Sequence, residues 1–192
     1  MDLTPEKKLA GILAPIFALR GKNDLGIGDV AALGEFVDWS AAYGFGLVQL
    51  LPINETGNDN SPYNAISSVA LDPTTIEAIP EKLPDLSEDA YREVTAGFDL
   101  EALRAGPVKY AEVKRLKREL LSRAFTHFLA TSWKRNDRRA REFRRFIAAE
   151  KSWLADYALF RVLIDANGGT ERWDQWPDEQ KTAALAREWL AK

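Results

Sequence analysis

Two apolar runs near the start of the chain predict two buried strands. The runs are Gly11–Leu19 and Phe45–Ile53, and each is nearly continuous between polar flanks. Such runs are typical of strands that are covered on both faces, as in parallel sheets. Pro15 has no backbone N–H to donate, which argues against an uninterrupted first strand.

Between the two runs the apolar positions change to helical spacing. They fall at Val30, Leu33, Phe36 and Val37. This spacing predicts a helix over about 30–43, with Asp29 as its N-cap and Gly44 at its end. A strand, a helix and a strand in succession predict a βαβ unit with a right-handed crossover.

A long polar segment, residues 54–64, follows the second run. It contains four asparagines, one glycine and one proline. These residue types favour turns, so one interpretation is a surface turn cluster. The other is a binding loop, because ligands of parallel α/β proteins bind where strands end, and this segment emerges there.

From about residue 84 onward the chain predicts helices. One apolar stripe runs through Val113, Leu116, Leu120, Ala124 and Phe128, and another through Trp153, Tyr157, Phe160 and Ile164. The second stripe ends at Asn167-Gly168-Gly169, a natural helix stop. We expect a further helix near 178–191, and a loop with short helical turns over 81–106.

Composition excludes several kinds of chemistry. The 192 residues carry a formal net charge of −3, no cysteine and a single histidine, His127. Disulfides, thiolate zinc sites and multi-histidine metal sites are therefore excluded, and we expect no metal and no cofactor. Carboxylates, hydroxyls, amides and aromatic rings remain, and these suit sugars. His127 lies beside the apolar stripe of its helix and is expected to be at least half-buried.

The chain shows no apolar run that predicts a signal peptide or a membrane span of roughly 18 residues. We therefore expect a cytoplasmic protein with no membrane partner. The stretch from Lys109 to Lys151 contains fourteen Lys and Arg residues but only five Asp and Glu residues. A nucleic-acid-binding helical protein is one alternative, but the apolar residues of this stretch have core spacing, so we expect a solvated helix face and no nucleic-acid partner.

Two further motifs each have two interpretations. Gly26-Ile27-Gly28-Asp29 resembles a phosphate-binding turn, but it lacks the third glycine of a dinucleotide fingerprint and the Lys-Ser/Thr of a P-loop. A tight turn explains its glycines. Trp173 and Trp176 could stack on pyranose rings, although such tryptophans more often pack one helix on another.

Several blocks stand in order along the chain: Gly11–Leu19, Gly26–Asp29, Gln49–Pro52, Asp59–Tyr63, Val108–Lys114, Trp153–Phe160 and Trp173–Pro177. Together they resemble the N-terminal region of the 4-α-glucanotransferases (amylomaltases, disproportionating enzymes) of the α-amylase-like clan. The resemblance covers residues from about 10 to about 178. It implies an α/β fold, a partial (β/α)8 TIM barrel with its first two strands and a large helical insertion.

In this interpretation residues 10–80 form the first βαβ unit with a donor-site loop, and 81–192 form the helical subdomain. The resemblance implies retaining transfer of α-1,4-glucan segments between maltooligosaccharides, which uses two carboxyl groups roughly 5 Å apart. The family's nucleophile Asp, acid/base Glu and stabilising Asp follow later strands and have no counterpart here. We therefore assign no catalytic residue, expect an N-terminal fragment that is inactive alone, and expect the C-terminal remainder of the barrel as a partner.

The family's Ser-Pro-Tyr block lines the subsite of the donor glucose, and the resemblance carries this role to Ser61 and Tyr63. Asp59 could bind a sugar hydroxyl. Asn58 and Asn60 replace the Tyr and Asp of many members, which puts the contacts of those two side chains in doubt. A non-catalytic glucan-binding or interaction module is the other alternative, and titration with maltoheptaose would separate it from an enzyme fragment.

Overall fold

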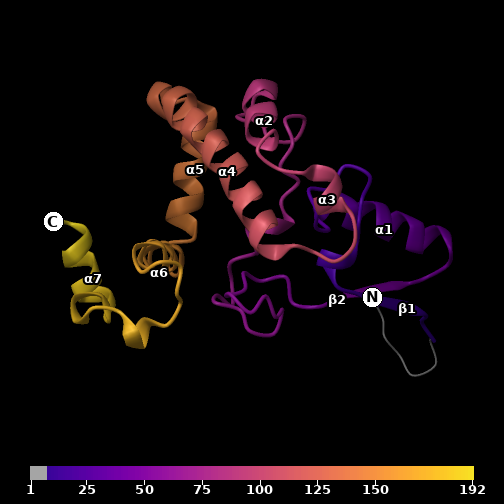
Figure 1. Ribbon diagram of the computed structural model, residues 1–192, viewed down its shortest axis with the longest axis horizontal. Helices are drawn as coiled ribbons and strands as arrows, with labels where there is room; N and C mark the ends of the chain where they lie inside the picture. Colours follow the sequence, from indigo (N-terminus) through magenta and orange to yellow (C-terminus); the bar gives the residue numbers. More distant parts are fainter. Residues whose placement is uncertain (1–7) are drawn as a thin grey trace. The chain divides into compact units, whose positions relative to one another are not determined.

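The computed structural model describes residues 8–192, which form two compact units (Figure 1). Among the described residues, the first unit contains 8–53 together with Leu71–Leu129. The second contains Asn54–Ala70 together with Ala130–Lys192. Each unit is thus assembled from segments that are distant in the sequence. Within residues 8–192, none of the helices combines the length and the apolar character that crossing a membrane requires.

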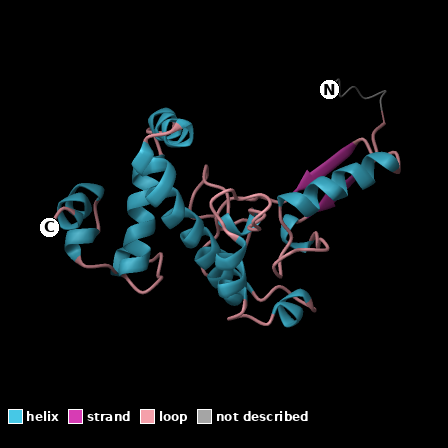
Figure 2. Cartoon of the chain, turned by 90° about the horizontal axis from the view of Figure 1, so that it is seen from above, coloured by secondary structure: helices cyan, strands magenta, loops and turns pink. Residues whose placement is uncertain are grey.

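A parallel pair of strands lies in the first unit. β1 (Gly11–Ala14) pairs with β2 (Leu47–Leu50) along their full lengths. α1 (Val30–Ala42) connects the strands and runs beside them (Figure 2). The order of strand, helix and strand, and the parallel pairing, are as predicted. In the part of the chain that is described, the sheet contains these two strands alone.

Two details of the strand prediction are wrong. Pro15 is the N-cap of a 3-10 turn, η1 (Ile16–Ala18), so β1 covers only the first half of the predicted strand. Leu13 is 57% exposed and Leu47 is 45% exposed, so the strands are not buried on both faces. The physical reason is that successive side chains of a strand point to opposite faces, and α1 runs along only one of them.

The predicted ends of α1 are confirmed. The carboxylate of Asp29 accepts hydrogen bonds from the backbone N–H groups of Ala31 and Ala32, at 3.1 and 3.2 Å. These bonds satisfy two of the donors that every helix leaves free at its N-terminus. Gly44 follows the helix with φ +83°, a left-handed conformation that glycine adopts without strain.

A long helix organises the core of the first unit. α4 (Tyr110–Phe128) packs its predicted stripe as far as Ala124 in one core with α2 (Glu88–Thr95) and α3 (Leu100–Arg104), and it also contacts the turn η2 (Pro73–Thr75). Leu103, Val113, Leu116 and Leu120 are all 0% exposed. His127 is exposed rather than half-buried, because this core ends at Ala124, one turn before the end of α4.

The second unit is helical apart from the segment 54–70. Its elements are the π-helical turn η3 (Leu129–Trp133), α5 (Arg138–Ala149), α6 (Leu154–Ala166), η4 (Trp173–Gln175), η5 (Asp178–Gln180) and α7 (Ala183–Leu190). α6 ends before Gly168, at φ +70°, as predicted. The predicted helix over 178–191 is broken in two, because the Thr182 hydroxyl caps a new helix by accepting from the N–H of Leu185.

Candidate functional site

The segment that follows β2 is a closed loop whose backbone is tied together at its base. The N–H of Glu55 donates to the carbonyl of Ala70 at 3.0 Å, and the N–H of Ile66 donates to the carbonyl of Glu55 at 2.8 Å. An isolated antiparallel bridge pairs Thr56 with Ala65. We call residues 54–70 the polar loop. Its backbone bonds bring its two ends together and leave residues 57–64 as its tip.

A carboxylate organises the tip of the polar loop. Asp59 accepts from the backbone N–H of Ser61 at 3.2 Å and from the side-chain amide of Asn64 at 2.6 Å. Asn60 has φ +55°, a left-handed conformation that asparagine tolerates better than most residues, and its amide donates to the carbonyl of Asn58. The tip is therefore a turn that is held by its own side chains.

The three predicted sugar-contacting residues all lie in this tip. Asp59 and Ser61 are in direct contact through the hydrogen bond described above. The side chain of Tyr63 is 75% exposed, whereas Ser61 is partly buried. A phenol that is this exposed leaves its ring face and its hydroxyl accessible to a ligand.

A buried carboxylate ties the polar loop to α6. Glu55 is 7% exposed. One of its oxygens accepts a hydrogen bond from the hydroxyl of Tyr157, and the other lies 3.4 Å from Nη1 of Arg161. Tyr157 and Arg161 are four residues apart on α6, so they project from the same face of the helix.

A second connection lies at the tip. The backbone N–H of Asn58 donates to Oε1 of Glu171 at 3.2 Å, and its side-chain amide donates to Oε2 at 2.8 Å and to the carbonyl of Gly169 at 3.0 Å. A Cβ on Gly57 would lie 2.7 Å from Oε1 of Glu171, so a larger residue there would require the Glu171 side chain to shift. Asn58 thus connects the polar loop to the turn after α6.

The partners of the polar loop, two on α6 and one in the turn after it, could not be predicted from the sequence. The spacing of Tyr157 predicts packing in an apolar stripe, and Tyr157, Arg161 and Glu171 each lie more than 100 residues from the loop residue that they contact. The sequence carries one signal: a glutamate shortly after an apolar run, in a loop otherwise rich in neutral turn residues, would need a partner if buried.

The two candidate sugar-stacking tryptophans have different environments. Trp176 is 3% exposed, packs on Phe160 with ring centroids 5.4 Å apart, and donates its Nε1–H to the carbonyl of Thr170 at 3.1 Å. Trp173 is 58% exposed. The packing interpretation is therefore right for Trp176, and only Trp173 presents a ring to solvent.

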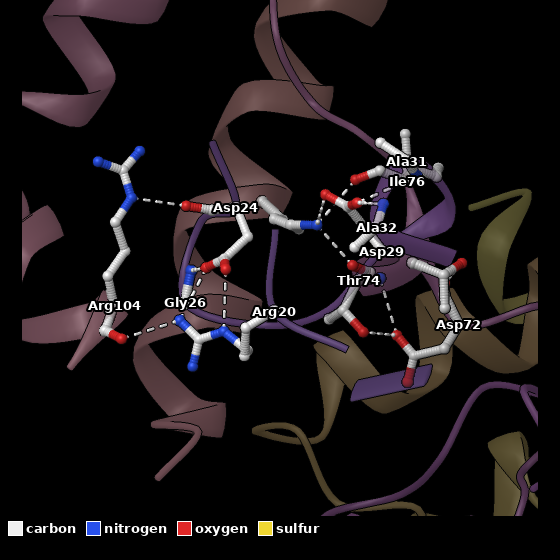
Figure 3. Close-up of polar contacts among 12 residues, drawn as sticks. Arg20, Asp24, Gly26, Asp29, Ala31, Ala32, Asp72, Thr74, Ile76 and Arg104 are labelled. Carbon is white, nitrogen blue, oxygen red and sulfur yellow. Dashed lines mark hydrogen bonds and ion pairs between the residues drawn. The ribbon is translucent and has the colours of Figure 1, made fainter. Parts of the chain in front are cut away.

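The glycine turn before α1 has a structural explanation. A Cβ on Gly28 would lie 1.9 Å from the carbonyl oxygen of Ile16, so no other residue fits without moving the backbone. Asp24 accepts from the N–H of Gly26 at 2.8 Å and from the guanidinium of Arg20 at 3.0 and 2.8 Å (Figure 3). These contacts support the tight turn that the sequence predicted.

A buried lysine lies next to this turn. Lys117 of α4 is 1% exposed, and its Nζ donates to the carbonyls of Thr74 and Ile76 at 2.6 and 2.8 Å. Oδ2 of Asp29, the N-cap of α1, lies 3.8 Å from the same nitrogen. Burial lowers the pKa of Lys117 to about 8, and the nearby carboxylates, first Asp29, oppose that change. Because its Nζ is engaged by two carbonyls and a carboxylate, we interpret Lys117 as a structural link between α4, η2 and α1.

Basic residues of α5 contact acidic and aromatic side chains. Arg138 pairs with Glu142 at 3.2 Å, and the guanidinium of Arg144 lies 4.0 Å from the centroid of the Trp133 ring. Among residues 8–192, no three side chains of the types His, Asp and Glu gather in a way that could hold a metal ion.

The comparisons with known proteins agree with the resemblance. A family model described as 4-alpha-glucanotransferase matches residues 14–191. A 4-alpha-glucanotransferase of Chlamydia pneumoniae is 36% identical over 169 residues, which are 87% of this chain and 30% of the relative. One of Aquifex aeolicus is 34% identical over 177 residues, 91% of this chain and 32% of the relative. The 4-alpha-glucanotransferase DPE2 of Oryza sativa is 33% identical over 81% of this chain and 16% of its own length.

The chain therefore spans about a third or less of these relatives' length, while nearly all of it matches. The strand–helix–strand unit and the helices that follow are a mixed α/β arrangement consistent with part of such an enzyme. This chain belongs to the 4-α-glucanotransferase family.

Proposed function

We propose that this chain forms part of the donor-sugar site of a 4-α-glucanotransferase, with Ser61, Tyr63 and Asp59 as the residues that contact α-1,4-glucan. The observation that carries the proposal is the polar loop, which follows a strand of the parallel pair, where ligands of such folds bind. The hydroxyls of Ser61 and Tyr63 would hydrogen-bond the sugar, and the exposed Tyr63 ring would shape its pocket. The carboxylate of Asp59 already accepts two hydrogen bonds within the turn. Its remaining lone pairs would accept a hydrogen bond from a sugar hydroxyl.

In the same proposal β1 and β2 are the first two strands of a (β/α)8 barrel. Residues 10–80 are the first βαβ unit with the donor loop, and 81–192 are the helical insertion. The reaction retains the configuration of the α-1,4 bond, and its two carboxyl groups come from residues outside this chain. Transfer exceeds hydrolysis where an acceptor hydroxyl is held in place and water is excluded.

The test is a titration of the ¹⁵N-labelled chain with maltoheptaose, followed by NMR. We expect weak binding, with Kd on the order of 1 mM, and shifts centred on the amides of Ser61 to Asn64. Tyr63→Ala should weaken binding by about fivefold, as the loss of one hydrogen bond of about 1 kcal/mol predicts. Tyr43→Ala is the matched control, because Tyr43 is 70% exposed but lies on the first unit.

Absence of shifts at about 50 mM maltoheptaose, or an equal effect of the two tyrosine variants, would contradict the glucan contact. A cellooligosaccharide of similar length, which has β-1,4 bonds, should produce no comparable shifts. The purified chain should also fail to disproportionate maltotriose. Measurable activity would show that the catalytic carboxyl groups lie within these 192 residues.

A further inference from the structure

The connection between Glu55 and α6 is an unusual way to attach a loop. A carboxylate that is 7% exposed has lost most of its hydration, which is costly unless the charge is paired and hydrogen-bonded. An apolar residue could occupy such a place without that cost, and buried ion pairs often add little net stability. An ion pair does fix the relative orientation of the groups that it joins, because the carboxylate oxygens must lie close to particular donors.

The backbone of Glu55 is engaged as well as its side chain. Its N–H and its carbonyl bind Ala70 and Ile66, in the second half of the polar loop. Its carboxylate meanwhile binds the hydroxyl of Tyr157 and faces the guanidinium of Arg161. One residue thus joins the two ends of the polar loop and connects them to α6.

The helix that receives Glu55 is itself well held. Leu159, Leu163 and Ile164 of α6 are buried in one cluster with Trp176 of the following segment. Ile66, of the polar loop, packs against the same cluster. The carboxylate therefore connects the loop to a helix that is packed into a hydrophobic cluster.

We propose that Glu55 is a positioning residue for glucan binding: through Tyr157 and Arg161 it holds the polar loop in the orientation that presents Ser61 and Tyr63 to the sugar. This inference rests on the proposed function. Glu55 itself touches no sugar. Its effect passes through the backbone of residues 56–66, so disturbing its partners on α6 changes sugar affinity from a distance.

The decisive variant is Tyr157→Phe, which removes one hydroxyl and keeps the ring. Two properties are measured: the hydrogen exchange of backbone amides, and the Kd for maltoheptaose. We expect the exchange of the Ile66 amide to accelerate about tenfold and the Kd to rise about fivefold, while exchange at Leu163 in α6 stays unchanged. A merely structural role would change Leu163 as well as the loop. Tyr91→Phe is the control, since Tyr91 is also partly buried but lies in the first unit.

A conservative pair at Arg161 tests the charge. Arg161→Lys keeps a cation opposite Oε1 of Glu55 and should retain most of the affinity, whereas Arg161→Met should weaken it about as much as Tyr157→Phe does. Glu55→Gln should weaken it at least as much. If Glu55→Gln does not fold, the variants of α6 carry the test.

The outcomes separate this inference from the proposed function. A wild-type chain that binds no maltoheptaose refutes the proposed function and, with it, the sugar part of this inference. If the wild type binds and Tyr157→Phe changes neither the exchange of Ile66 nor the Kd, the positioning role alone is refuted. Faster exchange with an unchanged Kd also refutes it, because the loop is then held for a reason other than the sugar.

Discussion

Raising the pH above neutrality should stabilise the first unit through Lys117. The side chain is 1% exposed, and burial lowers its pKa from 10.5 to about 8. Four carboxylates, on Asp29, Asp24, Asp72 and Glu77, act in the opposite direction but do not cancel the effect of burial. Because the pKa is lower in the folded chain, the unfolded chain binds more protons between about pH 8 and 10.5, and stability rises with pH in that interval.

The magnitude follows from the two pKa values. At 1.36 kcal/mol per pKa unit, the charged form of Lys117 costs the folded state about 3 kcal/mol at any pH well below 8. Integrated from about pH 7.5 to 9.5, the relief of that cost is about 2 kcal/mol. Burial also raises the pKa of Tyr91 and Tyr110, so their ionisation removes stability only at higher pH, which sets the upper limit of the experiment.

The assay is urea unfolding of the wild type and of Lys117→Met at several pH values. A label of 5-fluorotryptophan makes Trp39, which lies in the first unit, a separate ¹⁹F reporter. The free energy of unfolding of the wild type, relative to the variant, should rise by about 2 kcal/mol between about pH 7.5 and 9.5. If the free energy of unfolding had the same pH dependence in the wild type and in Lys117→Met, the reasoning would be refuted. It would also be refuted if Lys117 titrated by NMR with a midpoint near 10.5. The NMR titration needs no variant.

Three further predictions concern the stability of the chain, measured by urea unfolding. Gly28→Ala should lower the free energy of unfolding by about 3 kcal/mol or more, because its Cβ would lie 1.9 Å from a backbone oxygen. Gly34→Ala in α1, where a Cβ would have nothing within 4 Å, should be neutral or slightly stabilising. Equal effects of the two variants would contradict the close approach at Gly28. Leu116→Ala should lower the free energy of unfolding by about 2–5 kcal/mol, whereas Leu190→Ala, at an exposed position, should lower it by well under about 1 kcal/mol. A similar loss for both variants would argue against the position of Leu116 in the core. Thr182→Ala should cost α7 about 1 kcal/mol through loss of its N-cap, and an unchanged midpoint would remove that role.

The elements that could be predicted are those whose signal is local. α1 begins and ends where Asp29 and Gly44 indicate, because capping depends on groups within a few residues. The stripe of α4 is buried as its spacing predicts. The strand errors come from the surroundings: an apolar run shows that burial is favourable, but only the neighbouring elements decide which faces are covered.

The candidate site shows the same division. The motif Asp59–Tyr63 could be recognised because its residues are contiguous, and the structure places all of them in one turn. The partners that hold this turn could not be found, since Glu55 meets Tyr157 across a separation of 102 residues. An apolar stripe also conceals such a residue, because a tyrosine can contribute its ring to packing and its hydroxyl to a buried carboxylate.

The sequence by itself determined the family of this protein, the strand–helix–strand order, the caps of its first helix and the motif that we propose as its sugar contact. These are encoded in short stretches of chain, where spacing and residue type are sufficient. Only the tertiary structure decided that the polar loop belongs with α6 and the segments after it, that Trp176 is buried while Trp173 is exposed, and that Lys117 is enclosed by carbonyls. Each of these depends on contacts between segments that are distant in the sequence. A hydrophobic or charged residue type does not specify which distant residue it will contact.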